Sequence, residues 1–272
     1  MARETYTHGH QPSVLRSHTW RTAANSAAYL LPHLREGQRL LDVGCGPGTL
    51  SLDLARLVGP GEVVAEDLSE DVLEIAEAYR RERGATNLRF RAGDVYALDH
   101  PDDSFDVAHA HQLLQHLARP ADALRELARV TRPGGLVAVR DSDYGGMFWA
   151  PADESLDRWQ EIYHAVSARN GGDADAGRHL LRFARQADVG AARVSSSNWT
   201  FADPESRSWW SGLWAERLVE SSLAQQAMDY GIATREELAA VSEGFRRWGN
   251  EPDGFFACPH GELLIEIPEP PQ

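Results

Sequence analysis

The chain has 272 residues, 42% of them hydrophobic and 25% charged, which excludes disordered and collagen-like chains and, at this length, predicts one large α/β domain with additions. Its 41 Asp and Glu residues outnumber its 27 Lys and Arg residues, giving a net charge of −14. This charge argues against nucleic acids and anionic membrane surfaces as partners and favours a small or neutral substrate, although it is also typical of a well-solvated surface.

The first predicted element is a leading helix over residues 19–34, which ends near Gly37 and whose last turn is weakened by Pro32. From Arg39 onward, short apolar runs alternate with amphipathic segments. The runs predict strands at 39–43, 62–66, 88–92, 105–110 and 136–140, and the segments predict helices at 49–58, 70–83 and 121–131. Strands that alternate with helices predict a parallel, doubly wound α/β sheet with right-handed crossovers.

The second half has a different composition, with seven of the eight tryptophans lying after Asp141. Apolar periodicity predicts helices at 152–169, 175–187, 204–228 and 234–248 and strands at 191–200 and 254–266. We expect these elements to complete the same sheet and to cap it. One domain with three regions is therefore predicted: an N-terminal lid segment and helix (1–36), a core (37–141), and a region of sheet completion and substrate cap (142–272).

Two cysteines, Cys45 and Cys258, allow at most one disulfide and exclude a disulfide framework. The N-terminus has no apolar signal segment, and no apolar stretch approaches the roughly 20 residues of a membrane span. These features predict a cytoplasmic protein, either a monomer or a homodimer, with no membrane partner.

A glycine loop follows the first predicted core strand, in the sequence Leu41-Asp-Val-Gly-Cys-Gly-Pro-Gly48. Glycines let the backbone approach a ligand closely. The dinucleotide fingerprint G-x-G-x-x-G needs glycine at position 49, where this chain has Thr49. Asp42 places a carboxylate near the loop, which disfavours a pyrophosphate and favours a cationic group such as a sulfonium. The alternative is a turn that only links strand to helix.

Over residues 37–141, the sequence resembles the class I S-adenosylmethionine-dependent methyltransferases, and within them the type 11, UbiE-like small-molecule group. The resemblance rests on LLDVGCGPGTLSLDLA, VVAEDLSEDVL, LRFRAGDVYAL, FDVAHAHQLLQHL and RPGGLVAV, in that order. It implies a Rossmann-like, mostly parallel sheet with a late antiparallel strand, an N-terminal helix and a C-terminal helical cap. It also implies methyl transfer from S-adenosylmethionine to a small O, N or C nucleophile, by SN2 displacement that depends mainly on proximity and orientation.

The resemblance also implies which residues hold the cofactor. Asp67, 19 residues after Gly48, matches the carboxylate that binds both ribose hydroxyls, with Glu66 on the opposite strand face. Asp94 matches the acceptor for the adenine amino group, with the Val95 N–H on a ring nitrogen. A surface acid and a turn-forming Gly-Asp pair are the respective alternatives. The full predicted set is Asp42, Gly44, Cys45, Gly46, Gly48, Asp67, Leu68, Asp94, Val95, Gln112 and Arg21, with Arg16 as an alternative to Arg21 for the cofactor carboxylate.

Three histidines, His109, His111 and His116, lie near the fourth core strand. No cysteine or carboxylate cluster completes a metal-binding set around them, so no metal is expected. His111 and His116 are candidates for a catalytic base because imidazole titrates near neutrality, and a packed or capping histidine is the alternative that this pattern favours.

The acceptor pocket is expected between the N-terminal segment and the late insertions. The predicted substrate-binding residues are Tyr6, His116, Asp141, Tyr144, Trp149, Trp210 and Trp214. Their aromatic character favours an apolar or aromatic acceptor, while Trp210 and Trp214, spaced i, i+4, are more often typical of a helix core than of a ligand site. Two further hypotheses remain open: a related fold that uses bound S-adenosylmethionine for non-methylating chemistry such as cyclisation, and a non-catalytic binding module.

Overall fold

Eight strands form one sheet in residues 6–9 and 11–269, the part of the chain that this computed structural model describes. The strand order is β3-β2-β1-β4-β5-β8-β6, with β7 paired to β8 along its other edge. Strands β1 to β5 are mutually parallel, and β8 is antiparallel to β5, as expected for the fold. The strands are β1 Leu40–Val43, β2 Val63–Asp67, β3 Leu88–Ala92, β4 Phe105–His111, β5 Thr131–Ser142, β6 Phe148–Ala150, β7 Ala191–Phe201 and β8 Phe255–Glu266.

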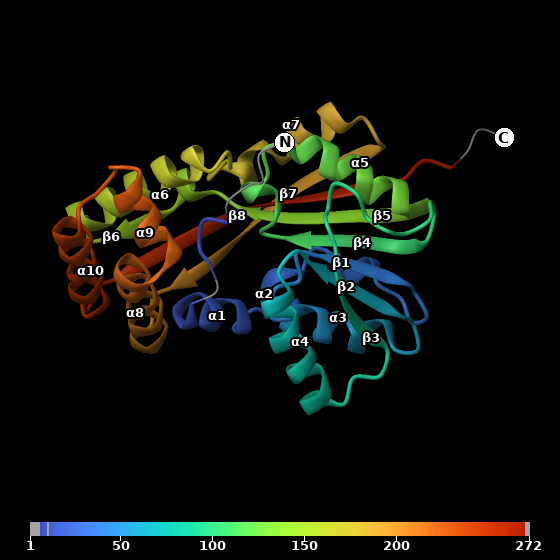
Figure 1. Ribbon diagram of the computed structural model, residues 1–272, viewed down its shortest axis with the longest axis horizontal. Helices are drawn as coiled ribbons and strands as arrows, with labels where there is room; N and C mark the ends of the chain where they lie inside the picture. The colour runs from blue at the N-terminus through green and yellow to red at the C-terminus, as the bar shows by residue number, and fades with distance from the viewer. Residues whose placement is uncertain (1–5, 10, 270–272) are drawn as a thin grey trace.

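The core strands are apolar on both faces because helices cover both. Leu40 and Val63 pack into one buried cluster, and their neighbours Leu41 and Val64 pack into another on the opposite face. Helices α3 and α4 cover the first face, and α5 and α7 cover the second (Figure 1). The helices are α1 Pro12–Thr19, α2 Ala23–Ser26, α3 Thr49–Val58, α4 Glu70–Arg83, α5 Pro120–Val130, α6 Glu154–Arg169, α7 Ala176–Ala187, α8 Pro204–Glu220, α9 Ser222–Asp229 and α10 Arg235–Gly249.

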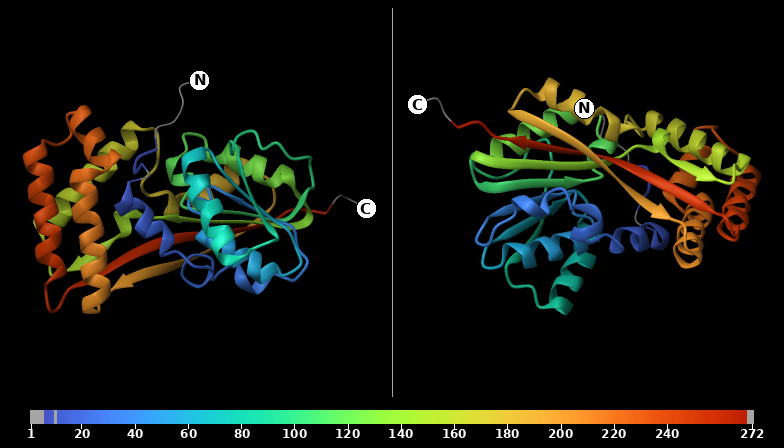
Figure 2. Two further views of the ribbon diagram at one scale, coloured as in Figure 1. Left: turned by 60° about the horizontal axis from the view of Figure 1, so that its bottom comes forward. Right: turned by 180° about the vertical axis from the view of Figure 1, so that it is seen from behind.

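A helical cap, made of α6, α8, α9 and α10, lies at one end of the sheet (Figure 1). Its core is aromatic: Trp159, Trp214, Trp248 and Phe245 are almost completely buried there. Strand β8 runs from the cap into the parallel sheet, and α1 lies between the cap and the core (Figure 2). Helix α1 packs on both α8 and α3. The cap, the N-terminal segment and the core sheet therefore meet at one place.

The predicted leading helix over 19–34 is wrong. Helix α1 ends at Thr19, and Thr22 starts the separate helix α2 because its side chain and that of Asn25 cap each other's backbone N–H groups. A single 3-10 turn, Leu31–His33, surrounds Pro32. The chain therefore turns twice before it enters the sheet.

Two later expectations also need correction. The helix predicted over 204–228 is two helices, because Ser221 adopts an extended conformation (φ −107°, ψ 171°) between α8 and α9. Strand β6 was not expected, since three residues are too short for a periodicity signal. In the described residues, no helix combines the length and the apolar character needed to cross a membrane.

Candidate active site

A cavity of about 810 Å³ opens at the carboxyl ends of strands β1, β2 and β4. Such edges are where open α/β sheets bind ligands. Eight of the predicted cofactor residues line it, together with three residues predicted for catalysis or substrate. These are Gly44, Gly46, Asp67, Leu68, Asp94, Val95, Gln112 and Arg21, and His111, His116 and Tyr6. We call this space the main cavity.

The glycine loop forms one wall of the main cavity through Gly44 and Gly46, whereas the predicted residues Cys45 and Gly48 lie outside its lining. Gly44, Gly46 and Gly48 have φ angles of +73°, +55° and +77°, which side chains rarely tolerate. A Cβ atom on Gly48 would lie 2.4 Å from the Phe90 ring, so this glycine is also required by close packing. Cys45 follows the same turn, and burial raises the pKa of its thiol, which keeps it protonated.

Asp67 stands at the end of β2, facing the glycine loop. Its Oδ2 accepts the Gly46 N–H at 2.9 Å, and its Oδ1 accepts the Ser69 N–H at 3.0 Å. Each carboxylate oxygen keeps a second lone pair for a ligand hydroxyl. The carboxylate is therefore held in place at the cavity wall and can still accept two hydrogen bonds.

Asp42 lies beneath the loop, outside the lining of the main cavity, and borders a small neighbouring pocket of about 20 Å³. It is 2% exposed. Its Oδ2 accepts a hydrogen bond from the Ser51 hydroxyl at 2.5 Å, and its Oδ1 lies 2.8 Å from His109 Nδ1. These contacts join strand β1 to helix α3 and to strand β4. Among the described residues, no group of three His, Cys, Asp or Glu side chains has an arrangement that could hold a metal ion.

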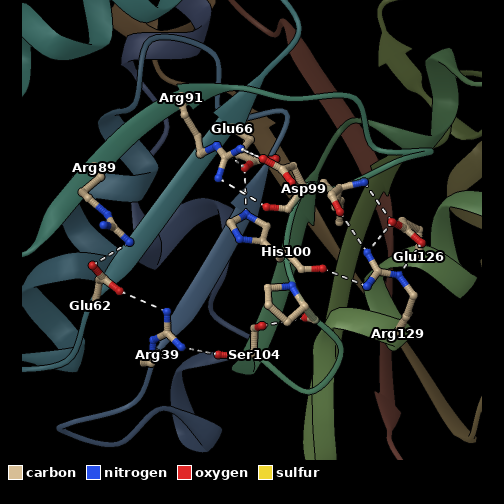
Figure 3. Close-up of polar contacts among 12 residues, drawn as sticks. Arg39, Glu62, Glu66, Arg89, Arg91, Asp99, His100, Ser104, Glu126 and Arg129 are labelled. Carbon is tan, nitrogen blue, oxygen red and sulfur yellow. Dashed lines mark hydrogen bonds and ion pairs between the residues drawn. The ribbon is translucent and has the colours of Figure 1, made fainter.

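The segment after β3 carries Asp94 and Val95 and is held in place by Glu66 on β2. Asp94 Oδ1 accepts the Tyr96 N–H at 2.9 Å. Glu66, completely buried, places Oε1 2.8 Å from His100 Nε2 and 3.1 Å from Arg91 Nε (Figure 3). Sequence reasoning treated Glu66 only as the neighbour of Asp67. In the structure it anchors both ends of the segment that carries Asp94.

Helix α5 also holds the segment after Asp94, through side-chain hydrogen bonds to its backbone. Glu126 accepts the Leu98 N–H at 2.8 Å, and Arg129 donates to the carbonyl oxygens of Leu98 and His100 at 2.9 and 2.8 Å (Figure 3). Arg129 also pairs with Glu126. The backbone around Asp94 is thus preorganised before any ligand binds.

Arg21, Gln112 and His111 form the inner end of the main cavity. Gln112 has a φ of +52°, and its Nε2 lies 2.7 Å from Ser142 Oγ and 2.8 Å from His260 Nε2. Its Oε1 accepts a hydrogen bond from Arg21, whose Nε has no partner in the described structure. Burial lowers the pKa of Arg21 to about 10, so the guanidinium is still charged at neutral pH.

His111 is 4% exposed, and in the described structure neither of its ring nitrogens has a hydrogen-bond partner. Burial, followed by the nearby charges of Arg21 and Arg140, lowers its pKa well below 6.5. The ring is therefore neutral at neutral pH and has a free nitrogen to accept a hydrogen bond or a proton. Buried polar atoms without partners are uncommon in folded proteins, and they mark places where a ligand or water is expected.

The outer end of the main cavity is aromatic. The Tyr6 and His116 rings meet edge to face at 4.9 Å. His8 contacts His116 at 5.7 Å and stacks on Tyr163 at 5.4 Å. Burial lowers the pKa of His116 to about 3 and raises that of Tyr6 to about 12, so both rings are neutral. Sequence reasoning missed His8 and Tyr163, which only the folded chain brings to this place.

Five predicted substrate residues do not line the main cavity. Tyr144 stacks on Tyr163 at 3.7 Å, and Tyr163 in turn contacts His8. Trp210 and Trp214, 5% and 1% exposed, pack in the cap core, as the helix-core alternative expects. The fourth is Trp149, which stacks on Phe256. The fifth, Asp141, lies under the turn that carries His116.

Asp141 provides a stability prediction. It is completely buried, its Oδ1 accepts the Gln115 N–H at 3.0 Å, and its Oδ2 has no partner in the described structure. Burial raises its pKa to about 7, so above that pH the fold must hold an unpaired charge. We expect Asp141→Asn to stabilise the protein at pH 8 by about 1–3 kcal/mol and by less at pH 6. Thermal unfolding at both pH values measures this, and a lower melting temperature at pH 8 would contradict it.

The chain is similar to known methyltransferases over nearly its whole length. A family model described as a methyltransferase domain matches residues 34–188. An uncharacterized methyltransferase of Schizosaccharomyces pombe is 33% identical over 273 residues, which cover 97% of each chain. The UbiE ubiquinone/menaquinone biosynthesis C-methyltransferase of Azotobacter vinelandii is 34% identical over 57% of this chain and 62% of its own. The crystal structure of the [4+2]-cyclase SpnF is 26% identical, with a TM-score of 0.55 over 95% of this chain and 82% of its own.

Proposed function

Because the chain belongs to the S-adenosylmethionine-dependent methyltransferases, we propose that it transfers the methyl group to a small-molecule acceptor seated beside His116. The family match confirms the resemblance that the motifs predicted. The further steps of the proposal concern which residues hold the cofactor, how they promote transfer and which acceptor they admit.

The observation that carries the proposal is the wall of the main cavity formed by Asp67 and the positive-φ glycines. Because the strand order is β3-β2-β1-β4, the lining residues follow one another from Asp94, past Asp67, to His111, with Arg21 bonded to the adjacent Gln112. A carboxylate acceptor for ribose hydroxyls, a carboxylate acceptor for an amine and a guanidinium for a carboxylate therefore follow one another along one space. This order fits a nucleoside joined to an amino acid. The partnerless Nε of Arg21 also fits, because a ligand carboxylate would complete its hydrogen bonding.

In this proposal, Asp94 and Val95 hold the adenine, Asp67 the ribose, and Arg21 the carboxylate, while the glycine loop lets the backbone approach. When bound there, S-adenosylmethionine supplies a methyl group activated by a positively charged sulfur. The chain then has to align the acceptor and exclude water, which needs no strong catalytic base. The aromatic ring of His116 is placed to do both at the outer end of the cavity.

His111 and His116 are the candidates for accepting a proton from the acceptor. Both line the cavity, and both are neutral because burial lowers their pKa values. Of the two, His111 has both ring nitrogens without a partner in the described structure, whereas His116 Nε2 lies 3.1 Å from Gln115 Nε2. His111 is therefore the better placed of the two, and its low pKa limits it to a weak base.

A second candidate function is non-methylating chemistry such as cyclisation. The similarity to SpnF, described as a [4+2]-cyclase, supports it at 26% identity over 95% of the chain. The same cavity and the same cofactor contacts would serve both reactions. The fate of the methyl group distinguishes them.

Methyl transfer is tested by incubating the purified protein with methyl-labelled S-adenosylmethionine and a panel of aromatic phenols, amines and carboxylic acids. We expect S-adenosylhomocysteine and one labelled product to form in equal amounts. Asp67→Ala should reduce the rate at low cofactor concentration, and Glu74→Ala, an exposed carboxylate on α4 outside the cavity lining, should not. Conversion of a panel member without S-adenosylhomocysteine would refute methyl transfer and support the second candidate.

A further inference from the structure

Arg217, on helix α8 of the cap, is a buried cation whose charge the described chain does not balance. It is 4% exposed. Both of its hydrogen bonds leave from Nη2, to the Ser13 carbonyl oxygen and the Ser17 hydroxyl, and Nε has none. Within residues 6–9 and 11–269, no carboxylate forms an ion pair with it. A buried charge without a counter-charge is costly, so an anion that reached this guanidinium would be bound favourably.

A short series of ring contacts joins Arg217 to the main cavity. Its guanidinium lies 5.0 Å from the centre of the Trp214 ring. The ring centres of Trp214 and His8 are 6.1 Å apart, and those of His8 and His116 are 5.7 Å apart. His116 lines the main cavity. The N-terminal segment of residues 6–9 thus separates the cation from the proposed seat of the acceptor.

Electrostatics links the same cation to residues at the cavity. Burial is the main cause of the lowered pKa of His8, and the charge of Arg217 is the next largest. Burial raises the pKa of Tyr6, and the charges of Arg21 and Arg217 partly oppose this rise. The Tyr6 phenol, which lines the cavity, therefore lies in the field of two guanidiniums. Burial also lowers the pKa of Arg217, the response expected of a cation without a counter-charge.

Arg21 and Arg217 are two cations near the site, and the cofactor has one carboxylate. If Arg21 takes that carboxylate, as the proposed function requires, Arg217 is left for the acceptor. The space around it is aromatic, with the rings of His8, Tyr163 and Trp214 in contact with one another. Arginine binds a carboxylate through two parallel hydrogen bonds, which makes a planar aromatic acid a good match.

We propose that the acceptor is an aromatic carboxylic acid, and that its carboxylate binds Arg217 after Tyr6 and His8 move out of the space between this side chain and the main cavity. This inference rests on the proposed function, since it assigns the acceptor of the same site. It also gives the N-terminal segment a role: Tyr6 and His8 occupy the aromatic seat until the acceptor displaces them.

Helix α8 offers a matched control in Arg207. This side chain is 6% exposed, donates to the Ala202 and Gly254 carbonyl oxygens and, within the described residues, also lacks a carboxylate partner. It lies ten residues away on the same helix, about 15 Å at 1.5 Å per residue. Substitution of Arg207 thus removes a buried cation from α8 without touching the cavity.

The test uses benzoate and its neutral amide, benzamide, as probes of the protein saturated with S-adenosylhomocysteine. Saturation-transfer NMR on the wild type should give benzoate a dissociation constant at least fivefold lower than that of benzamide. Arg217→Met should weaken benzoate at least tenfold and leave benzamide unchanged, and Arg207→Met should change neither. Should Arg217→Met fail to fold, Arg217→Lys, which keeps the charge but not the planar fork, is expected to weaken benzoate at least threefold.

Three results would overturn the inference: equal binding of the two probes, no binding of either, or wild-type benzoate binding by the folded Arg217 variant. Calorimetry with S-adenosylhomocysteine on the same samples separates this from failure of the proposed function. If S-adenosylhomocysteine binds and benzoate has no preference, only the acceptor assignment fails. If S-adenosylhomocysteine does not bind, the proposed function fails with it.

Discussion

Asp67→Ala is expected to weaken binding of S-adenosylhomocysteine by about 1–3 kcal/mol, roughly 5- to 150-fold in dissociation constant. The carboxylate stands on the wall of the main cavity, held by the Gly46 and Ser69 N–H groups. In the proposed function, its removal takes away the acceptor for the ribose hydroxyls, and it also removes the acceptor of the Gly46 N–H in the glycine loop. Isothermal titration calorimetry measures the change directly.

The control for this experiment is Glu74→Ala. Glu74 is an exposed carboxylate on helix α4, seven residues beyond Asp67 and outside the cavity lining. It changes the net charge by the same amount, so any general electrostatic effect on the ligand appears in both variants. Unchanged affinity in Asp67→Ala, or an equal loss in both variants, would refute the ribose role.

Acidification is expected to destabilise the protein strongly below pH 6.5. Burial lowers the pKa values of His8, His111, His116 and His260, to about 3 for His116. In the unfolded chain these groups titrate near 6.5, so below that pH the unfolded state binds protons that the folded state does not. Stability is fully present above pH 6.5 and is lost as the pH falls toward the folded pKa values.

The expected size follows from the same linkage. Between pH 6.5 and 5.5, each of the four histidines contributes a loss of about 1 kcal/mol, and Asp141, whose pKa is raised by burial, offsets about 1 kcal/mol. The net loss of about 3 kcal/mol corresponds to a melting temperature lower by about 6–12 °C. Thermal unfolding at the two pH values measures this loss.

His116→Gln serves as the matched variant, because it removes one of the four titrating groups. We expect the fall in stability between pH 6.5 and 5.5 to shrink by about 1 kcal/mol in this variant. A melting temperature that stays constant or rises on acidification in the wild type would contradict the assignment of neutral buried histidines.

The sequence predicted the core sheet well because its signals there are local. Helix α4 occupies the predicted residues 70–83, where Ser69 caps its start by accepting the Val72 N–H and Gly84 ends it in a left-handed conformation. The predicted β8, over 254–266, begins only one residue later in the structure. Apolar alternation and capping residues are properties of a few neighbouring residues, so one chain is enough to detect them.

The N-terminal region was predicted poorly because its structure depends on tertiary contacts. Trp20 interrupts the predicted helix and packs edge to face on Trp199 at 5.1 Å and against Trp209 at 5.2 Å. Trp199 in turn donates a hydrogen bond to the Asn25 carbonyl oxygen at 2.6 Å. These partners lie far along the chain, so no local pattern reveals the two turns between α1 and the sheet.

The two ends of the candidate site differ in the same way. Gly44, Asp67 and Asp94 follow consecutive strands, and all three line the main cavity. The acceptor end is built by segments from the N-terminus, the β5–α6 region and the cap, and His8, Tyr163 and Arg217 escaped notice. A signal for Arg217 was available: it shares one helical face with Trp210 and Trp214, at spacings of seven and three residues, where a charge is unexpected.

A crystal structure with S-adenosylhomocysteine tests the central claim most directly. We expect one ligand per chain in the main cavity, with the adenine amino group on Asp94, both ribose hydroxyls on Asp67 and the amino-acid carboxylate on Arg21. A ligand bound elsewhere, or in this cavity with its ribose away from Asp67, would contradict it.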